Sequence, residues 1–197
     1  MQDSQISHVL FPHTMSFSFR SITSSSLLLL TLALAPVCSA AEPRPEGHSH
    51  QGHAFNDGPR QSAPLIYDTG DVHFPITTSW KDGQDYFNQG LGQLHGFWYY
   101  EAERSFRQII AKDPNCAMAY WGIAMANWEN EKRAKEFIAK ANQHLDKANA
   151  HEKLYIKAQT NYLDGKPDDA KKRNQELLHD IESIIEKHPD DIEAKAM

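Results

Sequence analysis

Residues 86–124 read YFNQGLGQLHGFWYYEAERSFRQIIAKDPNCAMAYWGIA, and their spacing determines which kind of fold the chain can adopt. The informative positions are an aromatic residue and a glycine four apart, an alanine and a phenylalanine four apart, and a closing proline: Tyr86, Gly90, Ala102, Phe106 and Pro114. Residues four apart share one face of an α-helix. We therefore expect two helices that approach closely at Gly90 and Ala102, with Phe106 filling the gap between them.

The same pattern begins again 34 residues later, at Tyr120 and Ala124. It resembles the tetratricopeptide repeat family, which implies antiparallel helix pairs stacked into an α-solenoid and a role in binding other proteins. The second copy does not finish in register, because Glu136 stands where an alanine is expected. Ala134 and Ala141 are the alternative small residues in that helix.

Helical patterns run through residues 79–197, so we predict an all-α domain there. The pattern opens at Ser79 and Asp82, which are spaced like a capping box. Further helices are expected at about 115–127, 130–149, 151–164 and 167–188. Residues 189–194 echo the turn at 114–119, which indicates a truncated repeat array that continues beyond residue 197.

The first 41 residues read as a secretory signal peptide, since an apolar core at 27–35 follows Arg20 and precedes small residues. Met15 is an alternative start, and Cys38 offers an alternative reading as a lipidated residue. Residues 42–78 are rich in Gly, Pro and His and predict an arm or linker. Residues 47–61 and 93–102 are similar to exported bacterial tetratricopeptide proteins, so the resemblance implies a periplasmic or extracellular protein.

A net charge of −6 argues against a nucleic-acid partner, because duplex binding depends on clustered Lys and Arg. No phosphate-binding loop or nucleophile motif is present, and His151-Glu152 lacks the second histidine of a zinc-protease helix. We therefore predict a non-enzymatic module that binds a protein or peptide.

Three histidines, His48, His50 and His53, could ligate Zn or Cu from the arm. The competing interpretation is a solvated arm without a metal. If the metal is bound, the alternative function is periplasmic metal binding, with the helices as support.

Four consecutive aromatic residues, Phe97 to Tyr100, cannot all face one side of a helix. Most should pack in the core, and Tyr120 and Trp121 are expected to continue the cluster in space. We predict that Trp98 and Tyr100 face outward and bind the partner. An acid–base reading of His95 with Glu101, Glu103 and Arg104 competes with ordinary surface residues, which are favoured.

Overall fold

The structure is a computed structural model that describes residues 55, 57–59, 61–66, 68–165 and 169–197. Its described residues form seven α-helices and one short 3-10 turn at Leu145–Lys147. The helices are α2 (Gly83–His95), α3 (Tyr99–Lys112), α4 (Ala117–Ala126), α5 (Glu131–Gln143), α6 (Ala150–Asp164), α7 (Ala170–Lys187) and α8 (Ile192–Ala196). The all-α prediction for this part of the chain is confirmed.

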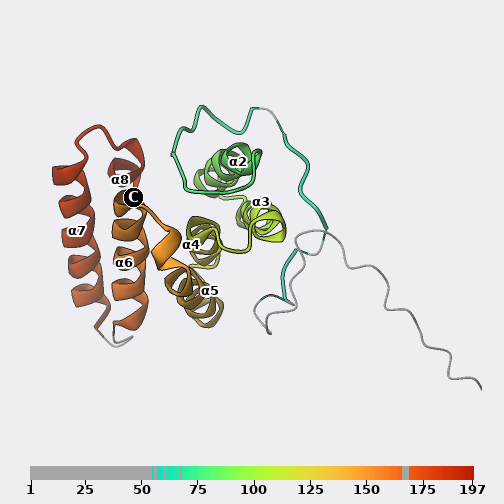
Figure 1. Ribbon diagram of the computed structural model, residues 1–197. Helices are drawn as coiled ribbons and strands as arrows, with labels where there is room; N and C mark the ends of the chain where they lie inside the picture. Colours follow the sequence, from blue (N-terminus) through green and yellow to red (C-terminus); the bar gives the residue numbers. More distant parts are fainter. Residues whose placement is uncertain (1–54, 56, 60, 67, 166–168) are drawn as a thin grey trace, which may run out of the picture. The chain divides into compact units, whose positions relative to one another are not determined.

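Helices that follow one another in the chain pack as antiparallel pairs, α2 with α3, α4 with α5 and α6 with α7 (Figure 1). The first helices of successive pairs also touch, since α2 contacts α4 and α4 contacts α6. Each helix therefore buries its apolar face partly against the other helix of its pair and partly against the next pair. None of the described helices is long and apolar enough to cross a membrane.

Phe106 holds the first two pairs together at the place where the sequence predicted a gap. Its ring is fully buried and lies against both Gly90 of α2 and Gly122 of α4. A β-carbon at either glycine would lie 2.7 Å from the ring, which is closer than real contacts. The predicted close approach at Gly90 is confirmed, and the ring bridges three helices rather than two.

Residues 61–66 and 68–79 lie across the helices as an extended strap. Phe74 is buried against Phe87 and Tyr155. Side-chain amides of α2 hold the main chain of the strap: Gln84 accepts from the amide of Ile76, and Gln89 from that of Ile66. The sequence offered residues 71–76 as an apolar strap over the first helix or as a short strand, and the strap is what forms, whereas the contacts of Pro64 and Ile66 with α2 were not predicted.

The capping box predicted at Ser79 and Asp82 is wrong, since no side-chain bond caps α2. The Ser79 amide instead donates to Asp113 Oδ2 at 2.7 Å, and the Thr78 hydroxyl donates to the same oxygen at 2.9 Å. Asp113 thus ties the strap to the end of α3.

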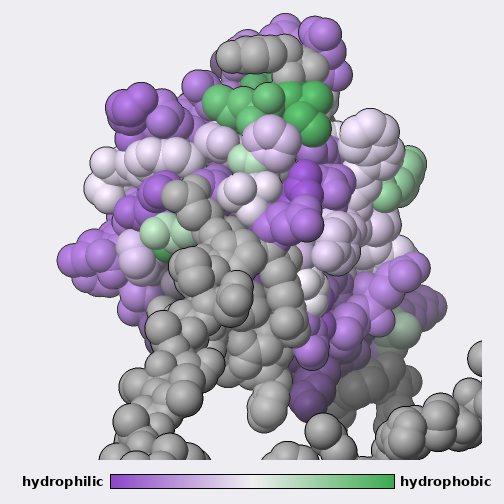
Figure 2. Space-filling view, turned by 90° about the vertical axis from the view of Figure 1, so that its right-hand side faces the viewer, coloured by the Kyte–Doolittle hydropathy of each residue, from purple (hydrophilic) through white to green (hydrophobic). Residues whose placement is uncertain are grey.

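The side of the molecule on which α3 lies is mostly hydrophilic among its described atoms (Figure 2). Hydrophobic atoms on that face gather near its upper edge in the same view. Ile66 of the strap is among the large apolar side chains that are exposed, at 42%.

Candidate protein-binding groove

A groove of about 400 Å³ lies between α2, the start of α3, α4, α6, α7 and α8, and its walls are mainly apolar. Its lining residues come from the ends of α2 and α4 and the turns that follow them, from the first residue of α3, and from α6, α7, α8 and the residue after α8: Leu94, His95, Phe97, Tyr99, Met125, Trp128, Gln159, Tyr162, Leu177, Ile181, Glu193, Ala196 and Met197. Concave apolar surfaces with a few polar groups are the usual form of a ligand site.

The rim of the groove is formed by the unusual end of α2. The Trp98 amide donates to the Gln93 carbonyl at 2.8 Å and the Phe97 amide to the Leu94 carbonyl at 3.1 Å. These bonds form a Schellman motif, whose penultimate residue adopts a left-handed conformation and is usually glycine. Here Gly96 has a negative φ, and Phe97 takes the left-handed conformation with φ of 61°. A bulky side chain in that conformation is strained, and such strain is concentrated at functional sites.

Three aromatic rings form a chain along this rim. The Phe97 and Tyr99 centroids lie 6.3 Å apart, and those of Tyr99 and Trp128 lie 6.5 Å apart, both edge-on. Phe97 is 77% exposed and Trp128 56% exposed. Large apolar side chains that stay in solvent next to a hollow surface mark an interaction site.

A polar contact between side chains of α2 and α8 lies among the lining residues of the groove. His95 Nε2 lies 2.8 Å from Glu193 Oε2, and the carboxylate is almost completely buried. Burial raises the pKa of Glu193 above its ordinary value, and the nearby His95 offsets only part of that shift. The pair thus fixes α8 as one wall of the groove.

The predicted binding residues Trp98 and Tyr100 are both exposed, at 60% and 59%. Neither is among the residues that line the groove. The expectation of four aromatic residues on one helix is wrong, because α3 begins at Tyr99. Phe97 and Trp98 belong to the turn before it.

Tyr120 and Trp121 do not continue this aromatic surface but pack in the core, which was the interpretation favoured for most of these aromatic residues. Both are fully buried. Trp121 packs against Phe87 and Tyr155, and Tyr120 stacks on His144. All but one of the residues of α4 are buried, so this helix has no side that faces solvent and its aromatic rings lie in the core.

The residues of the proposed acid–base cluster do not come together. His95 pairs with Glu193, and Glu101 pairs with Arg104 at 3.0 Å. Glu103 is buried at 3% exposure, so its interpretation as a surface residue is wrong.

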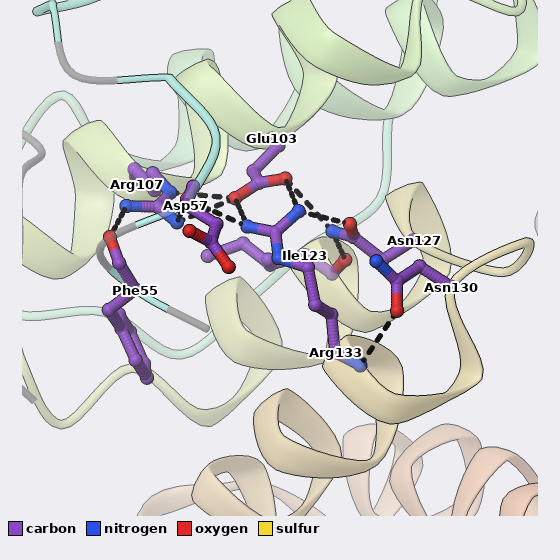
Figure 3. Close-up of polar contacts among 8 residues, drawn as sticks. All are labelled: Phe55, Asp57, Glu103, Arg107, Ile123, Asn127, Asn130 and Arg133. Atoms are coloured by element: carbon purple, nitrogen blue, oxygen red, sulfur yellow. Dashed lines mark hydrogen bonds and ion pairs between the residues drawn. The ribbon is translucent and has the colours of Figure 1, made fainter. Parts of the chain in front are cut away.

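Glu103 instead joins a buried network of α3, α4 and α5 (Figure 3). Its Oε1 lies 2.7 Å from Arg107 Nη2 and 2.7 Å from Arg133 Nη2, and its Oε2 accepts from Asn127 Nδ2 at 2.9 Å. Burial lowers the pKa of Arg107, and the attraction of Glu103 opposes that shift. Two arginines thus share one carboxylate in the interior.

The predicted metal ligands His48, His50 and His53, the leader at 1–41 and Cys38 lie outside the described residues. Within the described ranges, no group of three or more His, Cys, Asp or Glu side chains is arranged to hold a metal ion. His151 stacks on Phe74 and pairs with Asp191 at 2.7 Å.

Sequence reasoning missed Trp128, Glu193 and the role of Phe97. A signal for Phe97 was present, because the residue after Gly96 follows the last helical turn of α2, where a left-handed residue is common. No local sequence signal predicts that Trp128 or Glu193 lies beside Phe97. They are 31 and 96 residues away from Phe97 in the chain, and only the packing of the helix pairs brings them to the same groove.

Comparisons of the chain with protein-family models, with curated proteins and with solved structures found no significant match. The tetratricopeptide resemblance therefore stays a prediction. What is established is an all-helical domain of packed helix pairs with an aromatic-rimmed groove.

Proposed function

We propose that this chain is an exported, tetratricopeptide-like module that binds an extended segment of another protein in the groove. The observation that carries the proposal is the strained and exposed Phe97 beside the exposed Trp128 at the mouth of a mainly apolar hollow. Folding alone would favour glycine at position 97 and a polar residue at position 128. Aromatic side chains there serve contact with a partner.

The chemistry of the groove indicates an apolar ligand. Leu94, Leu177 and Ile181 lie among its walls, whereas its one buried carboxylate, Glu193, is already paired with His95. A segment carrying aromatic or aliphatic side chains would bury surface against these walls at about 25 cal/mol per Å². The strap supports an extended segment as the ligand, because α2 already binds the extended backbone of the strap through Gln84 and Gln89.

Peptide selection on the domain tests this proposal. A random peptide library is selected against the full chain, and the affinity of the selected peptides is measured by fluorescence anisotropy. We expect enriched peptides to carry aromatic or aliphatic residues. Phe97→Gly and Trp128→Ala should each weaken binding about tenfold or more, since central aromatic contacts contribute about 2 kcal/mol or more.

The matched controls are Trp98→Ala and Tyr100→Ala, which remove equally exposed aromatic residues outside the groove. We expect them to change the affinity less than threefold. Peptides that bind all four variants like the wild type would refute the groove as the site. Loss of binding only in the Trp98 and Tyr100 variants would place the site where the sequence first suggested it.

A further inference from the structure

The buried network of Glu103 forms the base of a second site, on α3, α4 and α5, which holds residues of the arm. Phe55 is 2% exposed and lies edge-on between two rings, with its centroid 4.6 Å from that of Phe137 and 5.9 Å from that of Tyr120. The guanidinium carbon of Arg107 lies 5.8 Å from the Phe55 centroid. The pocket therefore accepts one aromatic side chain by shape, ring contacts and a cation.

Two arginines bind the main chain on either side of that ring. Arg107 donates to the carbonyl oxygens of Phe55 and Asp57, the latter at 2.7 Å (Figure 3). Arg133 Nη2 donates to the Asp57 carbonyl at 2.9 Å. These contacts recognise the backbone carbonyls of Phe55 and Asp57, in a segment that bends at positions 57 and 58, and they require no particular side chain at position 57, which is exposed.

The position three residues after the phenylalanine must be glycine. Gly58 has φ of +89°, a conformation that other residues rarely adopt. A β-carbon there would lie 2.8 Å from Arg133 Nη2 and 2.8 Å from Glu103 Oε1. Both atoms belong to the buried network and cannot move aside without breaking its bonds. The site thus selects a Phe-x-x-Gly segment.

The side chains that form this site also bind one another directly. Glu103 binds Arg107, Arg133 and Asn127, and Asn127 Nδ2 also donates to the Ile123 carbonyl at 2.9 Å. All of these groups come from α3, α4 and the α4–α5 region. A site whose geometry is fixed beforehand binds its ligand with a smaller loss of entropy.

We propose that this cradle is a peptide-binding site in its own right, which takes a Phe-x-x-Gly segment of a second protein when its own segment, with Phe55 and Gly58, leaves it. The resident segment belongs to the same chain, so its effective concentration at the site is in the millimolar range. It therefore excludes a competing segment until it is released. This site is separate from the aromatic groove, and neither proposal depends on the other.

The test uses a fluorescent peptide of residues 53–60 and the full chain carrying Phe55→Ala, which removes the resident anchor and leaves the site intact. We expect the variant to bind the peptide at least tenfold more tightly than the wild type does. Peptides with alanine in place of the phenylalanine or the glycine should not bind. Phe55→Leu is the matched control, since it keeps an apolar anchor and should exclude the peptide like the wild type.

A folded Phe55→Ala variant that does not bind the peptide would overturn the proposal, and so would equal binding by the wild type. Should Phe55→Ala fail to fold, Gly58→Ala weakens the resident segment by another route. The wild-type peptide should then raise the melting temperature of Gly58→Ala, whereas the peptide with alanine at the glycine position should not. Equal melting temperatures with both peptides would contradict the proposal.

Discussion

Phe97→Gly should separate binding from stability, because the side chain is placed at a cost to the fold. A residue with a β-carbon in the left-handed conformation costs about 1–2 kcal/mol relative to glycine. The ring is 77% exposed, and its one ring contact that involves a described neighbour is with Tyr99 at 6.3 Å. An aromatic pair contributes about 0.5–1.5 kcal/mol, and an exposed one falls at the low end of that range.

The two effects together predict that Phe97→Gly leaves the free energy of unfolding unchanged or raises it by about 1 kcal/mol. A buried phenylalanine truncated to alanine would instead cost about 3–5 kcal/mol. Phe97→Ala is the control, since it removes the ring and keeps the strained backbone. Glycine should therefore exceed alanine in stability by about 1 kcal/mol, because only glycine adopts the left-handed conformation without strain.

Urea unfolding followed by far-ultraviolet circular dichroism measures both variants. The reasoning fails if glycine at position 97 is no more stable than alanine, because the left-handed conformation would then carry no cost. It also fails if Phe97→Gly lowers stability by as much as a buried phenylalanine does.

Three further variants probe the packing. Gly122→Ala should destabilise the domain by about 1–3 kcal/mol, because the added β-carbon would lie 2.7 Å from the Phe106 ring, and Phe106→Leu should relieve part of this loss in a double-mutant cycle. Glu103→Gln should cost about 3–5 kcal/mol in urea unfolding, since Arg107 loses its buried partner, whereas the exposed-pair control Glu101→Gln should change stability by less than about 1 kcal/mol. Burial by itself would raise the pKa of Asp113, but the hydrogen bonds from Thr78 and Ser79 outweigh burial and hold this pKa below the ordinary 3.8. The stability that ionised Asp113 contributes is therefore present above pH 3.8 and is lost as the pH falls through the lowered pKa. Asp113→Asn should accordingly weaken the dependence of the melting temperature on acid pH.

The helix pairs could be predicted from the sequence because their signals are local. Phe106 lies four residues after Ala102, and Pro114 marks the end of α3 within two residues. Small residues at Gly90 and Gly122 leave room that a phenylalanine fills. Spacing of this kind specifies both the helical face and the close approach of two helices.

The arm and the buried charges could not be predicted, because long-range packing determines them. Phe55 lies in a segment without a helical or alternating period, so its burial is not visible in the pattern, whereas the apolar run around Phe74 already suggested a strap over the first helix. Glu103 and Arg107 look like an exposed pair four residues apart on a helix. They are buried because the arm covers them and Arg133 reaches them from α5.

The groove was only partly predictable for the same reason. The sequence indicated that some of the aromatic residues at 97–100 face outward, and it placed the binding surface on Trp98 and Tyr100. The structure places Phe97 rather than Trp98 on the groove, since the left-handed turn at the end of α2 redirects the chain there.

Photo-crosslinking from within the groove tests the central claim most directly. Benzoylphenylalanine replaces Trp128 in one variant and Leu178, which is exposed on α7 outside the groove, in another. A peptide chosen by selection is added, the sample is irradiated, and the products are mapped by mass spectrometry. The account predicts a crosslink from position 128 and none from position 178. Equal crosslinking from both positions, or none from position 128 while the peptide still binds, would contradict it.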